Sequence, residues 1–75
     1  MTGDNKKPEI FELTEDYIEL IKLLKFVGIC QTGGQAKLAV EDGLVTVDGE
    51  VESRKRRKVR KGMRVEIEGQ TILVV

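Results

Sequence analysis

The spacing of apolar residues changes once along this chain, at Gly43, and that change constrains the fold more than any other feature. From Leu20 to Val27, apolar residues recur every three or four positions, which predicts one buried face of an α-helix. After Gly43 the spacing becomes two, because Val45 and Val47 alternate with a polar residue, and this predicts a half-buried strand. Helices followed by strands in one short chain indicate the α+β class.

Two short helices are expected before this switch. The first begins between Thr14 and Glu19 and ends at Gly28, because glycine readily adopts the left-handed conformation that closes helices. The second begins at Thr32, whose hydroxyl can cap the first helical N–H groups, and ends at Gly43. About four residues join the two helices, so an antiparallel or steeply crossed pair is expected.

Strands are expected in the second half of the chain. Asp48-Gly49 predicts a tight hairpin, since both central residues of a type I′ turn need a positive φ. Alternation returns over Met63–Ile67, and Gly69-Gln70 can form a type II′ turn into a C-terminal strand over 71–75. The expected architecture is two short helices packed on a small antiparallel β-sheet.

The chain is expected to form one domain over residues 9–75, preceded by a disordered tail over 1–8. Ile10 and Phe11 can form an edge strand at the start of this domain. Cys30 is the single cysteine, which excludes an internal disulfide and suits a reducing compartment. No apolar stretch reaches the roughly 18 residues of a membrane span, so we expect a cytoplasmic monomer without membrane attachment.

Enzyme signatures are lacking, and we expect no catalytic residue, no metal and no cofactor. The sequence has no histidine, which is the commonest general base and metal ligand, and one cysteine cannot build a zinc site. Cys30 precedes a helix N-terminus that could lower the pKa of its thiol, but the role of a small semi-buried hydrophobe is favoured. Gly33-Gly34 suits a flexible helix start and a phosphate-contacting turn equally well.

Charge is strongly segregated although the net charge is zero. The formal charge is −6 over residues 1–53, +8 over residues 54–64 and −2 over residues 65–75. A polyanion responds to the local field, which is screened over about 8 Å at physiological salt. The middle run has eight cations in eleven residues and no acid, so a polyanion site is favoured over an ordinary solvated face. Val59 is expected to tie this run into the sheet.

The kind of cation and the scarcity of aromatic residues narrow the choice of polyanion. Five of the eight cations are arginines, whose planar fork binds phosphate bidentately. Glu50 and Glu52, just before the run, are placed to form cross-strand pairs with part of it. The aromatic residues are Phe11, Tyr17 and Phe26. Because Phe26 is expected in the core, stacking platforms for single strands are not expected, and the pattern favours a structured nucleic acid without separating RNA from DNA.

From about Ile18 to Gly69, the order of these pieces resembles the S4 RNA-binding domain, the alpha-L motif of ribosomal protein S4. That motif has a leucine-rich helix ending in glycine, a Ser/Thr-started second helix, an acidic residue with glycine, a Val-x-Val strand and an Asp-Gly turn. The corresponding segments here are Leu20–Gly28, Thr32–Lys37, Glu41–Gly43, Val45–Val47, Asp48–Val51 and Val59–Val65. Small bacterial stand-alone S4-like proteins share the start of the second helix and the Arg-rich segment.

The resemblance implies a non-enzymatic module that binds structured RNA of the ribosomal or transfer RNA class, in association with the ribosome. Its implied contacts at the second helix are Thr32, Gly33, Gly34, Gln35 and Lys37. Its implied contacts in the basic run are Arg54, Lys55, Arg56, Arg57, Lys58, Arg60 and Lys61. Many S4 domains carry a basic side chain where this chain has Gly33, so contacts there would come from backbone N–H groups or from Gln35 and Lys37.

Two other interpretations of the basic run stay open at this point. The run could dock on an acidic protein partner, and partners that survive RNase treatment would favour that interpretation. It could also attach to an anionic membrane surface, where each Lys or Arg adds about 1 kcal/mol. No amphipathic basic helix in the sequence supports the membrane interpretation.

Overall fold

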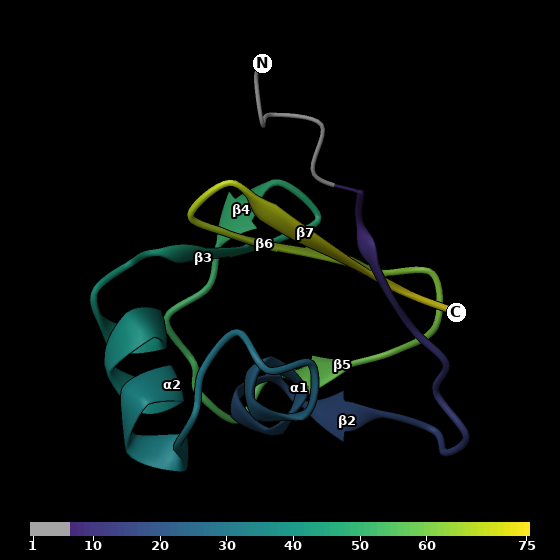
Figure 1. Ribbon diagram of the computed structural model, residues 1–75, viewed down its shortest axis with the longest axis horizontal. Coiled ribbons are helices and arrows are strands. Elements are labelled where there is room, and N and C mark those ends of the chain that lie inside the picture. The colour runs from purple at the N-terminus through teal and green to yellow at the C-terminus, as the bar shows by residue number, and fades with distance from the viewer. Residues whose placement is uncertain (1–6) are drawn as a thin grey trace.

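The two predicted helices lie on one side of a sheet in the computed structural model, which describes residues 7–75 (Figure 1). Helix α1 spans Leu20–Phe26 and helix α2 spans Gly33–Glu41. The strands are β1 (Glu9–Phe11), β2 (Ile18–Glu19), β3 (Val45–Val47), β4 (Glu50–Val51), β5 (Lys58–Val59), β6 (Arg64–Ile67) and β7 (Gln70–Val74). The tail predicted over 1–8 falls mostly on residues 1–6, which lie outside the described residues.

The main sheet has five strands in the order β1-β7-β6-β3-β4, and β2 pairs with β5 in a separate two-stranded sheet. Four strands of the main sheet are antiparallel as predicted, but β1 runs parallel to β7, so the sheet is mixed. The sequence indicates that β1 is a strand at an edge, and this is confirmed. Its direction depends on the path of the whole chain, which apolar spacing does not encode.

Helix α1 begins at Leu20 and not near Thr14, because Ile18 and Glu19 are used as strand β2 against β5. Gly28 ends the helix region with a φ of 83°, as predicted. Figure 1 shows α1 nearly end-on and α2 lengthwise, so the two helices cross steeply. The described residues contain no helix long and apolar enough to cross a membrane.

The two hairpins of the sheet use the same kind of turn. Asp48 and Gly49 have φ values of 52° and 89°, which confirms the predicted type I′ turn. Between β6 and β7 the central residues are Glu68 and Gly69, with φ values of 46° and 82°. The predicted type II′ turn at Gly69-Gln70 is therefore wrong by one residue. The observed turn matches the right-handed twist of the strands, and Gly69 removes the strain at one of its two positions.

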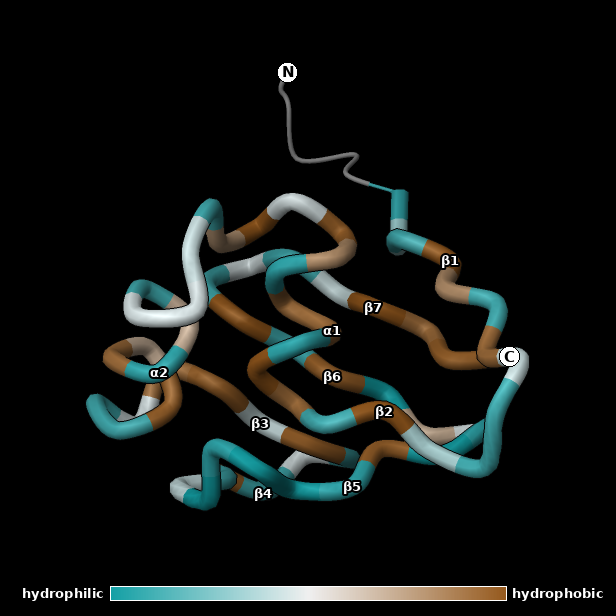
Figure 2. Tube along the Cα trace, turned by 90° about the horizontal axis from the view of Figure 1, so that it is seen from below, coloured by the Kyte–Doolittle hydropathy of each residue, from teal (hydrophilic) through white to brown (hydrophobic). Residues whose placement is uncertain are grey.

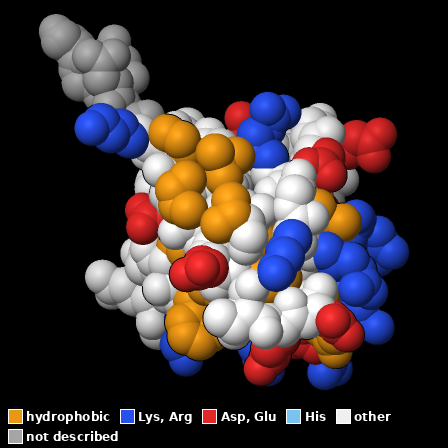
Figure 3. All heavy atoms as spheres, turned by 90° about the vertical axis from the view of Figure 1, so that its right-hand side faces the viewer, with side chains coloured by type: hydrophobic (Ala, Val, Ile, Leu, Met, Phe, Trp, Pro, Cys, Tyr) orange, Lys and Arg blue, Asp and Glu red, His pale blue; other side chains and the backbone are white. Residues whose placement is uncertain are grey.

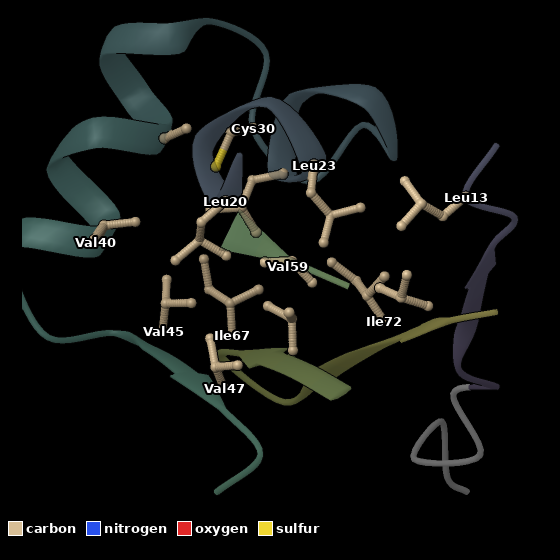
Figure 4. Packing of buried hydrophobic residues seen from close by; sticks show 14 residues of the cluster. Leu13, Leu20, Leu23, Cys30, Val40, Val45, Val47, Val59, Ile67 and Ile72 are labelled. Carbon is tan, nitrogen blue, oxygen red and sulfur yellow. The ribbon is translucent and has the colours of Figure 1, made fainter. Parts of the chain in front are cut away.

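The core fills the space between the helices and the sheet, and side chains point into it from both layers (Figure 4). Its buried members are Leu13, Leu20, Leu23, Leu24, Cys30, Ala36, Val40, Val45, Val47, Val59, Val65, Ile67, Ile72 and Val74. Strands β3, β6 and β7 contribute buried side chains to this core, and Figure 2 shows these strands as largely hydrophobic. The apolar spacing thus identifies the core-facing residues of both layers.

Cys30 and Phe26 lie outside this regular pattern, and their burial can be compared with the predictions made for them. Cys30 is 3% exposed, and burial raises the pKa of its thiol, so the interpretation as a small buried hydrophobe is confirmed. The prediction that Phe26 lies in the core is wrong, because 73% of it is exposed. Phe26 is the last residue of α1, beyond the Leu20–Leu24 face that meets the sheet, and its ring lies 6.1 Å from that of Phe11.

Candidate nucleic-acid interface

Residues 54–64, the basic segment, run from the end of β4 through β5 to the start of β6. Figure 2 shows the stretch from β4 to β5 as a continuous hydrophilic run along one side of the molecule. Val59 in the middle of the segment is fully buried and pairs with Ile18 of β2. The prediction that the segment is tied into the fold is therefore confirmed.

Backbone carbonyl groups of the basic segment complete the N-terminus of α1. The N–H of Leu20 donates to the carbonyl of Arg57 at 2.9 Å, and the N–H of Ile21 donates to the carbonyl of Lys55 at 3.2 Å. Glu19, at the N-cap position, makes no side-chain capping bond. The first N–H groups of a helix have no hydrogen-bond acceptor within the helix. The two carbonyl groups supply acceptors for α1, and the same bonds hold the basic segment against the helix.

A buried carboxylate fixes the same segment from the other side. Glu52 is 7% exposed and accepts hydrogen bonds from the backbone N–H and Nε of Arg54, both at 2.9 Å. It also accepts from Nη2 of Arg54 at 3.2 Å and from Nη1 of Arg57 at 2.7 Å. These bonds, led by that of the Arg54 side chain, lower the pKa of Glu52 to about 2 against the opposing effect of burial.

The sequence suggested that Glu50 and Glu52 pair with the basic run, and the structure separates the two. Glu52 pairs with Arg54 and Arg57 inside the loop that follows β4, not across two strands. Glu50 is exposed, and within residues 7–75 it forms no ion pair with the segment. Arg54 and Arg57 therefore support the loop as well as carrying charge.

The other cations of the segment differ in how they are paired. Arg56 Nε lies 3.4 Å from a carboxylate oxygen of Glu19, and Lys55 Nζ lies 3.9 Å from one of Glu41. Arg64 Nε lies 3.8 Å from Glu66. Three cations, Lys58, Arg60 and Lys61, form no ion pair with any carboxylate of the described part of the chain. Positive charge therefore remains in excess over the acids that face it.

Six cations of the segment line one open hollow of about 830 Å³, and Glu41 is the acid on its wall. These cations are Arg54, Lys55, Arg56, Arg57, Lys58 and Arg60. Such a concave, cationic wall attracts anions more strongly than a flat surface with the same charges, because field lines concentrate in it. Lys61 is exposed in the turn after β5 and is not part of this wall.

The start of α2 is organised by hydrogen bonds of its own. The Thr32 hydroxyl accepts from the N–H of Gln35 at 3.0 Å, which confirms the predicted N-cap. The side-chain oxygen of Gln35 accepts from the N–H of Gln31 at 2.7 Å. Gly33 and Gly34 are exposed, and a Cβ at Gly33 would meet nothing within 4 Å. Neither glycine is required by a positive φ or by close packing.

The basic segment meets α2 at the opposite end from Thr32, through the pair of Lys55 with Glu41. A nine-residue helix is about 13 Å long, so the helix start lies roughly that far along the axis. Gly33, Lys37 and Glu41 are spaced by four residues and share one side of the helix. The structure thus places Lys37 on the side that leads to the basic segment, while Thr32 and the residues next to it lie at the far end.

A family model described as the S4 domain matches residues 11–75. The chain belongs to the S4 domain family. It is 46% identical over 59 residues to the Escherichia coli (strain K12) protein YbcJ, which is named as a candidate RNA-binding protein. The match covers 79% of this chain and 84% of YbcJ, and the YbcJ of Shigella flexneri matches to the same degree.

Solved structures of two proteins share this fold. The solution structure of E. coli YbcJ, described as revealing an alpha-L motif involved in RNA binding, superposes with a TM-score of 0.74 at 39% identity. That match covers 100% of this chain and 96% of YbcJ. The crystal structure of 30S ribosomal protein S4e from Thermoplasma acidophilum superposes with a TM-score of 0.65 at 22% identity, over 77% of this chain and 31% of S4e. The second likeness shows the S4 fold alone.

Sequence reasoning missed one residue beside the basic segment of this S4 domain. Nζ of Lys58 lies 4.9 Å and Cζ of Arg60 lies 5.8 Å from the centre of the Tyr17 ring. These are cation–π distances. Tyr17 precedes β2, which pairs with β5, so the contact depends on strand pairing between segments far apart in the sequence. No local pattern around Tyr17 could have revealed it.

Proposed function

We propose that this S4 domain binds structured RNA of the ribosomal or transfer RNA class, and acts by binding without catalysis of its own. The observation that carries the proposal is the anchored basic segment, which holds Lys58, Arg60 and Lys61 exposed and outside any ion pair within residues 7–75. Its membership of the S4 family and its likeness to YbcJ, whose structure is described as RNA-binding, support RNA as the polyanion.

The anchoring favours a folded RNA over a flexible strand. Glu52 and the N-terminus of α1 hold the backbone of the basic segment in place before any ligand arrives. A pre-ordered set of cations loses little conformational entropy on binding and fits phosphates at fixed positions, as in a helical RNA. We assign phosphate contacts to Lys55, Arg56, Lys58, Arg60 and Lys61. Arg54 and Arg57 contribute charge and also support the loop.

The start of α2 supplies the second part of the proposed surface. Thr32 and Gln35 are engaged in the helix cap, so their role is to position the backbone N–H groups of Gly33 and Gly34. Those N–H groups and the positive end of the helix dipole suit a phosphate. Lys37 bridges this end and the basic segment, so one RNA backbone passing along α2 would meet both groups.

The proposed setting is that of S4 domains that act on ribosomal RNA. We place the protein in the cytoplasm, as a monomer associated with the ribosome. The location, the monomeric state and the ribosome association all depend on RNA being the ligand. If the ligand is not RNA, these three assignments no longer have support.

The test removes two unpaired lysines from the basic segment and compares them with two lysines elsewhere. The Lys58→Ala/Lys61→Ala variant is expected to bind an RNA hairpin more weakly, and to lower the slope of log K against log salt by roughly 0.7 to 0.9 for each phosphate that the protein no longer neutralises. The matched control, Lys7→Ala/Lys25→Ala, removes the same charge from exposed positions outside the segment. Arg54 and Arg57 stay intact, because replacing them would disturb Glu52.

Filter binding or fluorescence anisotropy over a range of salt concentrations would measure both variants. Equal salt slopes for the two variants would contradict the proposed surface. Unchanged RNA binding by both, together with protein partners that survive RNase treatment in a pull-down, would favour an acidic protein as the ligand of the basic segment.

A further inference from the structure

All aromatic side chains of this protein line one hollow. The sequence contains two phenylalanines, one tyrosine and no tryptophan. Phe11, Tyr17 and Phe26 all lie on the wall of an open hollow of about 520 Å³, between β1, the chain leading into β2, and α1. A hollow of this size is within the range of small-ligand sites. We call it the aromatic hollow.

The rings of this hollow are available to a ligand. Phe26 is 73% exposed and Tyr17 is 37% exposed, and the rings of Phe11 and Phe26 are tilted by 42° to each other. An exposed phenylalanine alone needs no explanation, but three aromatic rings around one hollow form a surface suited to a planar group. Figure 3 shows hydrophobic side chains gathered on the face where β1 and the C-terminus lie, with Lys and Arg side chains at its edge.

Tyr17 joins the aromatic hollow to the proposed RNA surface. Lys58 and Arg60, which lie over the Tyr17 ring, also line the cationic hollow of the basic segment. Neither cation lines the aromatic hollow, so the cations border the tyrosine outside it. A nucleotide whose phosphate meets Lys58 or Arg60 would therefore have its base within reach of the rings.

The polar groups of the hollow indicate which base fits. Glu15 and Asp16 on its wall are exposed carboxylates, which only accept hydrogen bonds when ionised. The wall also contains Glu19, which is paired with Arg56, and Lys22, the one cation among its lining residues, which can donate to a base oxygen such as O6 of guanine. Guanine presents two neighbouring donors, its N1–H and its N2 amino group, on one edge, and a carboxylate can accept both. Uracil presents a single donor on its pairing edge and fits such a wall poorly.

We propose that the aromatic hollow receives an unpaired base, guanine in particular, flipped out of an RNA whose phosphates lie on the basic segment. This inference rests on the proposed RNA-binding function and adds to it a contact with a single base. Aromatic side chains hold unstacked RNA bases in this way, and the hollow supplies the specificity that phosphate contacts lack. The sequence-based expectation that stacking platforms are lacking depended on placing Phe26 in the core, and the structure removes that ground.

The experiment compares three RNAs that differ only at one position. They are a blunt RNA duplex, the same duplex with one bulged guanosine, and the same duplex with an abasic bulge. The guanosine bulge is expected to bind roughly tenfold more tightly than the other two, at the low end of what one stacked base contributes. It should also quench protein fluorescence, because Tyr17 is the only tyrosine and no tryptophan is present.

Variants assign the effect to the rings. Phe26→Leu and Tyr17→Leu keep apolar side chains at exposed positions and are expected to lose the roughly tenfold preference while still binding the blunt duplex. Tyr17→Phe should retain the preference, measured with labelled RNA. Leu38→Ala is the control, because Leu38 is a 60% exposed hydrophobic residue on α2 outside the hollow. Circular dichroism would confirm that each variant is folded.

The outcomes separate this inference from the proposed function. Salt-dependent binding of all three RNAs with equal affinity and unchanged fluorescence would overturn the aromatic hollow as a base site and leave RNA binding standing. The hollow would then suit an apolar side chain of a protein partner. No binding of any RNA would overturn the proposed function itself. A fourth RNA, the same duplex with one bulged uridine, tests the choice of guanine, and equal affinity for the guanosine and uridine bulges would overturn that choice.

Discussion

The basic segment and the start of α2 form the two parts of the proposed RNA surface, and they are held in different ways. The basic segment is fixed both by a local partner, the buried Glu52 carboxylate in the same loop, and by a distant one, the N-terminus of α1. The start of α2 is fixed by bonds among Gln31, Thr32 and Gln35 alone. The more highly charged region is therefore the more firmly anchored one.

It follows from this contrast that the cations of the basic segment are not equivalent. Arg54 and Arg57 satisfy Glu52, whereas Lys58 and Lys61 have no ion-pair partner in the part of the chain that the structure describes. A change at the first pair should affect folding before binding, and a change at the second pair should affect binding alone. At the start of α2, backbone N–H groups and not charged side chains would contact the RNA phosphate. A substitution there can therefore change RNA binding without lowering the stability of the fold.

Removing the anchor of the basic segment should have the strongest effect. Glu52→Ala leaves Arg54 and Arg57 without their carboxylate and should lower the free energy of unfolding by about 3 kcal/mol, the upper end for losing hydrogen bonds to a charged group. No buried charge is left behind, because the arginine side chains are 71% and 30% exposed. Urea denaturation followed by circular dichroism would measure it. Glu50→Ala removes the same charge from an exposed site two residues away and should stay within about 0.5 kcal/mol of wild type. Equal destabilisation by the two variants would show that Glu52 does not anchor the segment.

Acid should release the same anchor gradually. The folded-state pKa of Glu52 is about 2, below the value of about 4.3 for glutamate in an unfolded chain. Since the folded-state pKa is the lower one, the stabilisation is fully present above about pH 4.3 and is lost as the pH falls toward 2, by about 2 to 3 kcal/mol. Glu52→Gln cannot titrate there. The difference in free energy of unfolding between wild type and Glu52→Gln should therefore shrink between pH 6 and pH 2, and a constant difference would contradict the low pKa.

At the start of α2 a weaker effect is expected, with opposite signs for stability and binding. Gly33→Ala meets no steric obstacle and should stabilise the protein by about 0.5 kcal/mol, because alanine favours helices over glycine. If a phosphate approaches the N–H groups at the start of α2, the added methyl group should weaken RNA binding by a few fold. Gln70→Ala, at an exposed position outside both regions, serves as a control for binding. A Gly33→Ala variant that is more stable and binds RNA normally would remove this helix start from the surface.

Local patterns in the sequence were sufficient for most of the fold. The leucine spacing, Thr32 as N-cap and the Asp48-Gly49 turn each depend on a few neighbouring residues, and all three are confirmed. The parallel direction of β1 and the use of Ile18 and Glu19 as a strand depend on contacts between distant segments. The exposure of Phe26 depends on where α1 ends relative to the sheet. The local spacing of apolar residues predicts none of these three features.

The candidate site was predictable as a list of charges but not as an arrangement. The excess of cations in residues 54–64 is visible in the sequence. Which of them are used internally depends on Glu52, whose burial follows from the path of the loop after β4. The contact of Lys58 and Arg60 with Tyr17 follows from the pairing of β2 with β5. Charge counting therefore identified the region and missed the aromatic wall beside it.

The parallel pairing of β1 with β7 has a consequence for the order in which the domain assembles. Glu9 pairs with Ile72, near opposite ends of the described chain, so this contact closes a longer loop than either hairpin. Such contacts form late in folding, because closing a long loop costs entropy before the contact can stabilise anything. β1 is also a three-residue edge strand, and such strands open at a low free energy. Because Phe11 lies on β1, the aromatic hollow is expected to be completed last and opened first.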